Sequence, residues 1–158
     1  MRLTTRTNLA MRTLMFCAVN DGRVVRKCEI AEVCNASENH LAQVVNTLAQ
    51  KGFVETQRGR SGGLRLARPA TEITVGAVLR AFETGMPFAE CFHAATNTCP
   101  LIGTCRFRDA LEAALEAFYG ALDKVNLSDL VAENHGLIHI LKLVEGRPLP
   151  ACDGPAGA

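Results

Sequence analysis

The sequence lacks a hydrophobic run that could cross a membrane, because no apolar stretch approaches the roughly 18 residues that a spanning helix needs. Residues 1–6 lead directly into a helical pattern and lack the uninterrupted apolar core of a secretory signal. The seven cysteines are an odd number, without the spacing of a secreted disulfide framework. We therefore expect a cytoplasmic protein whose cysteines are core residues, metal ligands or redox groups.

A strong net charge and a catalytic constellation are also missing. The formal net charge is only +1, so any nucleic-acid surface has to come from local clusters of charge. The four histidines have no acidic or metal-motif partner at a diagnostic spacing. No nucleophile stands beside a base in the sequence, and we expect that the protein is not an enzyme.

The 158 residues, 48% of them hydrophobic, are sufficient for one compact domain with an appendage. We divide the chain into a winged helix-turn-helix domain (1–85), a cysteine-containing loop (86–106), a long helix with a C-terminal helical segment (107–144) and a disordered tail (145–158). The predicted fold class is mainly α with a small β-hairpin wing.

Periodicity predicts the first domain. Apolar residues at helical spacing indicate helices over 7–19, 27–33 and 38–50, with Ser37 as the N-cap of the third. Alternating residues indicate strands over 53–57 and 64–67, joined by a glycine-rich turn. Two adjacent helices followed by a hairpin are typical of a winged helix-turn-helix.

The third helix has an apolar stripe and an amide-rich polar face. Amide groups both donate and accept hydrogen bonds, as base edges in the major groove require. An ordinary solvated face is the alternative, but such faces usually carry Glu and Lys. We expect this face to read DNA, through Ser37, Asn39, His40, Gln43 and Asn46.

The predicted hairpin concentrates positive charge at Arg58, Arg60 and Arg65. Arginines neutralise phosphates, and the glycines between them let the backbone approach a phosphate surface. A basic hairpin can also be a soluble loop. Because this hairpin directly follows the helix-turn-helix pair, we favour contact with DNA.

After a helix predicted over 75–83, a longer helix is predicted over 106–125, with apolar residues at every third or fourth position. The stripe is long for packing on so small a domain, although an intramolecular core is the alternative. Because twofold dimers read symmetric DNA sites, we expect a homodimer interface. Its predicted residues are Phe107, Leu111, Leu115, Phe118 and Leu122.

Cys91, Cys99 and Cys105 share one loop, separated by gaps of seven and five residues. Soft thiolates bind iron–sulfur clusters, zinc or copper(I), and these gaps are wider than the about two to four residues of structural zinc pairs. A larger inorganic core therefore fits best, while zinc, a thiol switch and an inert role stay open. The other cysteines are expected to be small buried hydrophobes at 17, 28 and 34, and a tail residue without a role at 152.

The chain resembles the winged-helix iron–sulfur regulators of the NsrR, IscR and RirA type. The motifs that carry the resemblance, in chain order, are Ser37-Glu38-Asn39-His40-Leu41, the segment 58–66 and the three cysteines. The resemblance covers about residues 1–132 and includes Arg12. The helix residues are most similar to the nitric-oxide-sensing repressor NsrR, and the seven-residue gap and Asn8 are similar to RirA.

The resemblance implies a homodimer with a 4Fe–4S or 2Fe–2S cluster on Cys91, Cys99 and Cys105, and Arg12 in the DNA-binding surface. The fourth ligand departs from the family pattern. Asn8 stands where some NsrR proteins have an aspartate from the partner subunit, and Arg108 stands where IscR-type proteins have a histidine. Candidates for that place are Asn8, Glu90, His93, a small thiol or water.

We therefore expect a repressor that binds a double-stranded DNA operator and responds to nitric oxide through the cluster. One alternative is an iron-status or cluster-status regulator of the same fold. Another is a cluster-containing redox protein, although that function would leave the amide-rich helix and the arginine-rich wing unexplained.

Overall fold

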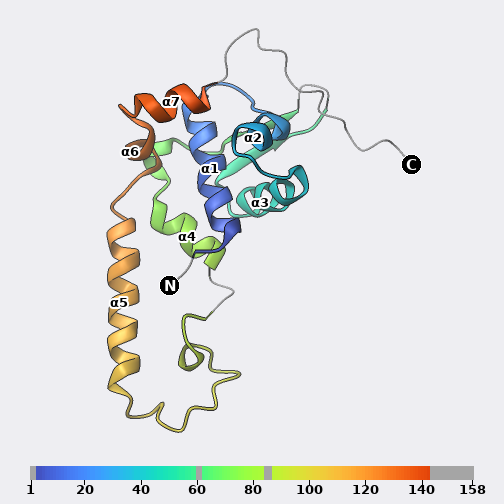
Figure 1. The fold of residues 1–158 in the computed structure, drawn as a ribbon. Coiled ribbons are helices and arrows are strands. Elements are labelled where there is room, and N and C mark those ends of the chain that lie inside the picture. The colour runs from blue at the N-terminus through green and yellow to red at the C-terminus, as the bar shows by residue number, and fades with distance from the viewer. Residues whose placement is uncertain (1–2, 60–61, 84–86, 143–158) are drawn as a thin grey trace, which may run out of the picture.

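The computed structural model describes residues 3–59, 62–83 and 87–142. Figure 1 shows a helical head from which one long helix, α5, extends. The fold is mainly α with a two-stranded hairpin, as predicted. The elements are α1 (Thr5–Val19), α2 (Lys27–Val33), α3 (Glu38–Gln50), β1 (Val54–Gln57), β2 (Gly63–Leu66), η1 (Ala70–Glu72), α4 (Val75–Glu83), η2 (Glu90–Phe92), α5 (Arg106–Leu122), α6 (Leu127–Val131) and α7 (His135–Leu141).

The helix-turn-helix pair is α2 and α3, and polar groups fix both helix starts. The buried Glu29 carboxylate accepts the Arg26 backbone N–H at 2.6 Å and the Arg23 guanidinium at 2.7 Å, and so caps α2. Ser37 Oγ caps α3 by accepting the His40 N–H at 3.3 Å. Between the helices, Asn35 adopts φ +48°, a left-handed conformation that Asn tolerates better than most residues.

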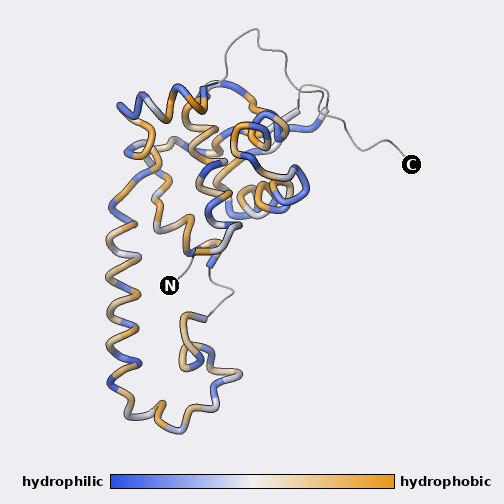
Figure 2. Tube along the Cα trace, in the orientation of Figure 1, coloured by the Kyte–Doolittle hydropathy of each residue, from blue (hydrophilic) through white to orange (hydrophobic). Residues whose placement is uncertain are grey.

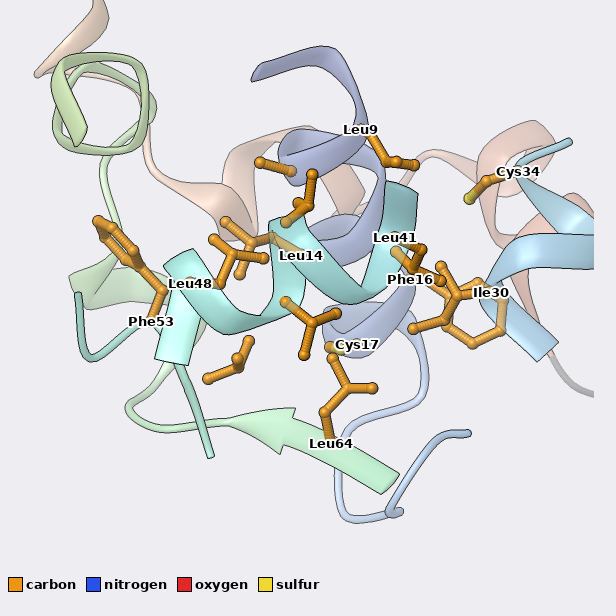
Figure 3. Close-up of a cluster of buried hydrophobic side chains, with 14 of the residues drawn as sticks. Leu9, Leu14, Phe16, Cys17, Ile30, Cys34, Leu41, Leu48, Phe53 and Leu64 are labelled. Carbon is orange, nitrogen blue, oxygen red and sulfur yellow. The ribbon is translucent and has the colours of Figure 1, made fainter. Parts of the chain in front are cut away.

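The core of the head lies around α1, as Figure 3 shows. Leu14 and Phe16 of α1 are fully buried against the apolar stripe of α3, and Leu64 of the wing closes the cluster. Burying one such side chain contributes about 1.5–3 kcal/mol. The stripe of α3, all buried, consists of Leu41, Val44, Val45 and Leu48.

The wing is an antiparallel hairpin in which Val54 pairs with Leu66 and Gln57 with Gly63. Val25, just before α2, adds an isolated bridge to Leu64, with backbone bonds of 2.9 Å and 2.8 Å. A Cβ on Gly63 would overlap the Val25 carbonyl oxygen. This glycine is therefore required for packing within the head, whereas the sequence suggested only an approach to phosphates.

Two polar clusters join α4 to its neighbours. At its C-terminal end, the Glu83 carboxylate accepts hydrogen bonds from Thr4 N–H at 2.9 Å, from Thr4 Oγ1 at 3.1 Å and from Thr7 Oγ1, all at the start of α1. Burial raises the pKa of Glu83, but the bonds from Thr7 and Thr4 outweigh it and lower the pKa below the usual range.

The second cluster joins α4 to the C-terminal end of α5. Arg80 binds both carboxylate oxygens of Asp123, at 2.5 Å and 2.8 Å, and its guanidinium lies 4.6 Å from the centre of the Tyr119 ring. The bond to Arg80 holds the pKa of Asp123 below its usual range. Gly76 lies against Asp123 so closely that a Cβ would overlap the carboxylate.

The predicted bounds of α2, α3 and α4 agree with the structure, but the long helix ends at Leu122 rather than at Val125. It ends early because Val125 O accepts the Val75 N–H and Asn126 pairs with Thr74, which draws the chain back to the head. Among the described residues, no helix is both long and apolar enough to span a membrane. The predicted tail, 145–158, lies outside the described residues.

Candidate nucleic-acid interface and cysteine segment

The polar face of α3 is presented to solvent, as a helix that reads DNA requires. Asn39, Gln43 and Asn46 are exposed, and His40 is half-buried. Because the opposite stripe of the helix is buried against α1, α2 and β1, the helix is held while its amides remain accessible. The structure thus groups the predicted α3 residues on one accessible surface.

Arg12 lies on α1 beside the helix-turn-helix turn. Its guanidinium donates a hydrogen bond to the Cys34 carbonyl oxygen at 3.3 Å, and the rest of the side chain is exposed. Arg6, which sequence reasoning did not single out, donates to Thr47 Oγ1 at 3.3 Å and links the start of α1 to α3. The N-terminal half of α1 therefore contributes cations close to the predicted reading helix.

The arginines of the wing have different surroundings. Arg58 is exposed just beyond β1, and Arg60 lies outside the described residues. Arg65 is paired with Glu55 on the opposite strand, through bonds of 3.1 Å and 2.9 Å from Nε and Nη2 to Oε2. Arg68 lies 5.1 Å from the centre of the Phe53 ring. Arg65 would have to exchange a carboxylate for a phosphate to bind DNA.

The cysteine segment, residues 87–105, contains three half-buried free thiols. Cys91 lies in η2, Cys99 in the following loop, and Cys105 at the N-cap of α5. Glu90 Oε1 accepts the Thr98 N–H at 2.9 Å and the Thr98 hydroxyl at 2.8 Å, and these bonds, the backbone one first, lower the pKa of Glu90. They close the part of the segment between the first two cysteines.

The donor set fits a soft metal or an iron–sulfur cluster in its chemistry, because thiolates prefer such partners. Its positions do not yet form a cage. In the part of the chain that the structure describes, no three His, Cys, Asp or Glu side chains are grouped as a metal site. The segment would therefore have to close to bring the three sulfurs to one group.

The candidates for a fourth ligand are likewise not grouped with the three cysteines as a metal site among the described residues. Asn8 is exposed on α1, where its amide donates to the Thr4 carbonyl oxygen at 3.3 Å. His93 Nδ1 is 2.8 Å from the Thr96 hydroxyl. The single chain does not distinguish among Asn8, Glu90 and His93, and the fourth ligand stays a prediction.

The other described cysteines are in the head. Cys17, Cys28 and Cys34 are all buried, as predicted, and Cys17 and Cys34 are free thiols. Cys28 is instead disulfide-bonded, so the prediction that it is simply a small buried hydrophobe is wrong. Burial, with the nearby Cys34, raises the pKa of Cys17 to about 12, and burial also raises that of Cys34, although Arg12 opposes it. Cys17 is therefore uncharged at neutral pH and suits a packing role. Cys152 lies outside the described residues.

The predicted dimer residues lie on α5, which has no buried residue in the single chain. Phe107 is 69% exposed, and the remaining four, Leu111, Leu115, Phe118 and Leu122, are half-buried. Figure 2 shows apolar and polar residues alternating along this extended helix. A stripe that its own chain covers only in part is what a helix at a subunit interface would have.

A helix-turn-helix with an accessible reading helix and a basic hairpin defines a DNA-binding transcriptional regulator of the winged-helix class. The family model described as "Iron-dependent Transcriptional regulator", Rrf2, matches residues 3–133. The chain belongs to the Rrf2 family, whose members are regulators and not enzymes.

Individual relatives and solved structures are similar to most of the chain. The chain is 43% identical over 145 residues to Protein aau3 of Rhizobium meliloti, covering 92% of this chain and 94% of that protein. It is 42% identical over 143 residues to the HTH-type transcriptional regulator NsrR of Geobacillus kaustophilus, covering 90% and 97%. Among solved structures, oxidized CymR of Staphylococcus aureus has a TM-score of 0.65 at 26% identity, covering 84% of this chain and 97% of that one. IscR of T. potens has 0.63 at 25%, covering 83% and 86%.

Proposed function

We propose that this chain is a homodimeric repressor that senses nitric oxide through an iron–sulfur cluster on Cys91, Cys99 and Cys105. The observation that carries the proposal is a single segment with three free, half-buried thiols, which leads directly into a helix whose apolar stripe is only partly covered. The relatives named NsrR and the similarity of residues 38–46 to that nitric-oxide-sensing repressor support the choice of signal.

In the proposed complex, α3 lies in the major groove. The exposed amides of Asn39, Gln43 and Asn46 then meet base edges, to which amides can both donate and accept hydrogen bonds. The wing lies on the adjacent backbone, where Arg58 contacts phosphates directly and Arg65 does so after leaving Glu55. Ser37 and His40 at the start of α3, Arg12 beside the turn and Arg60 in the wing complete the proposed surface.

The homodimer would form along α5. Two copies of the stripe from Phe107 to Leu122 would cover each other and remove apolar surface from water. A twofold dimer presents two reading helices to the two halves of a symmetric operator. Substituting Glu for Leu115 should convert the dimer to monomers in sedimentation velocity, while Glu at the exposed Ala113, off the stripe, should leave it intact.

When bound, an iron–sulfur cluster would supply iron that nitric oxide can attack. This chain would provide three thiolates from the cysteine segment. The hydrogen bonds between Glu90 and Thr98 would hold the first half of that segment in place. Because Cys105 occupies the N-cap position of α5, a change in the segment also acts on the start of the proposed dimer helix. Population of a DNA-binding dimer geometry would then depend on whether the segment is closed.

The test is an absorption spectrum of anaerobically reconstituted protein titrated with nitric oxide, followed by binding to DNA selected from random sequences by the wild type. We expect a visible iron–sulfur band, its loss with a few equivalents of nitric oxide, and release of DNA. Cys99→Ala should abolish the band, and Cys34→Ala, which removes a buried head thiol, should retain it. Equal iron content in both variants would refute the assignment.

Iron status is the second candidate signal, because the family description itself is iron-dependent. In that case the band would resist nitric oxide and would disappear when a ferrous chelator is added, with DNA binding changing in parallel. The family match favours either regulator over a cluster-containing redox protein.

A further inference from the structure

Arg108 has a buried polar atom that the described residues leave unpaired. Its Nε is out of contact with water and has no hydrogen-bond partner within residues 3–59, 62–83 and 87–142. Buried polar groups in proteins almost always have a partner, because an unmade hydrogen bond costs free energy. This N–H is enclosed by atoms of the chain itself, so it can gain a partner only when the segment around it rearranges.

The position of Arg108 connects it to the cysteine segment from two sides. Its guanidinium carbon lies 6.0 Å from the centre of the Phe92 ring, and Phe92 directly follows Cys91. Arg108 is also the third residue of α5, whose N-cap is Cys105. The cation thus lies beside the ring of the residue that follows Cys91, and three positions after Cys105 along the chain.

Nearby acids do not explain this placement. Glu112 is four residues further along α5, where a helical ion pair could form, yet the ion pairs of the described residues do not include Arg108. The side chain lies against an aromatic ring and buries its Nε. The conformation therefore holds a cation at the segment without a carboxylate to neutralise it.

We propose that Arg108 is the charge-compensating residue of the cysteine site, donating its Nε–H to sulfur of the group held by Cys91, Cys99 and Cys105. The inference rests on the proposed function. Three thiolates around an inorganic core form an anion, and an anion that leaves water needs a cation or hydrogen-bond donors. Arginine has only donors, so Arg108 acts on the ligands and is not itself a ligand.

This role predicts effects on the redox and binding properties of the site. A hydrogen bond and a positive charge at sulfur favour the reduced, more negative state, so they raise the reduction potential. Partners of this kind also change metal affinity by roughly 10–100-fold. Removing the cation should therefore lower the potential and accelerate the loss of iron.

The experiment compares wild-type protein with Arg108→Gln, Arg108→Lys and the control Arg106→Gln, which removes an exposed arginine from the same helix turn. Reduction potential is measured by anaerobic spectroelectrochemistry, and iron release by absorbance with a ferrous chelator. R108Q should have a lower potential and release iron roughly tenfold faster or more. R106Q should match wild type, and R108K should lie between wild type and R108Q.

The outcomes separate this inference from the proposed function. Wild-type protein that takes up no iron on anaerobic reconstitution would overturn both. A normal cluster in wild type, with the same potential and release rate in R108Q and R106Q, would overturn only the role of Arg108. Circular dichroism confirms that each variant is folded, and R108K supplies the comparison if R108Q is not.

Discussion

Replacing Gly76 with alanine tests the contact between α4 and the end of α5. Alanine normally stabilises a helix interior by about 1 kcal/mol over glycine. At Gly76, however, a Cβ would overlap the Asp123 carboxylate and lie 2.9 Å from the Asp123 backbone nitrogen. The carboxylate can rotate away, but the backbone nitrogen can move only if the end of α5 moves with it.

The expected result is a net loss of stability. Overpacking of this kind costs about 1–3 kcal/mol, against a gain in helix propensity of about 1 kcal/mol. We expect Gly76→Ala to lower the free energy of unfolding by up to about 2 kcal/mol. For a chain of this size, that corresponds to a fall in Tm of up to roughly 8 °C.

Gly120 provides the matched control. It lies inside α5, and a Cβ there would meet no atom within 4 Å. Gly120→Ala should therefore raise stability by up to about 1 kcal/mol. Both variants are measured by urea unfolding at one protein concentration. If Gly76→Ala is as stable as Gly120→Ala, α4 does not approach the Asp123 backbone closely enough to exclude a Cβ at position 76.

Three further predictions follow from the head and the wing. Because the pKa of Glu83 is lowered in the folded state, its carboxylate stabilises the fold at pH values above the usual Glu range. This contribution is lost as the pH falls through the folded-state pKa. The difference in unfolding free energy between wild type and Glu83→Gln, measured by urea unfolding, should therefore be larger at pH 7 than at acid pH. A pH-independent gap would contradict this. Ser37→Ala should cost about 1 kcal/mol in thermal melting through loss of the α3 cap, and Ser37→Asp should restore it. Arg58→Ala should reduce the slope of log DNA affinity against log salt concentration by about 1. Glu55→Ala should tighten DNA binding, because it releases Arg65 from its ion pair. Anisotropy titrations over a salt series measure both effects, and an unchanged slope in Arg58→Ala would show that Arg58 does not contact DNA.

The helices of the head could be predicted from the sequence because their signals are local. The stripe of α3, its cap at Ser37 and the break at Cys34-Asn35-Ala36 are each read from neighbouring residues. The end of α5 could not be predicted in this way. It depends on pairing between Val75 and Val125, which are distant in sequence.

In the candidate site, too, features set by neighbouring residues could be predicted from the sequence, and features set by distant residues could not. The exposed amides of α3 follow from helical periodicity, but the pairing of Arg65 with Glu55 depends on the strand register, and the need for glycine at position 63 depends on Val25. The three thiols lie in a segment without periodic structure, so their spacing indicates a common role and not a common position. Their grouping, the fourth ligand and the dimer interface stay predictions.

The two faces of α3 have separate duties. The residues that hold the helix, Leu41, Val44, Val45 and Leu48, are buried, while Asn39, Gln43 and Asn46 point outward without a packing role in the core. In the proposed function, substitutions on the outward face therefore change target preference at little cost in folding, because no core contact is lost.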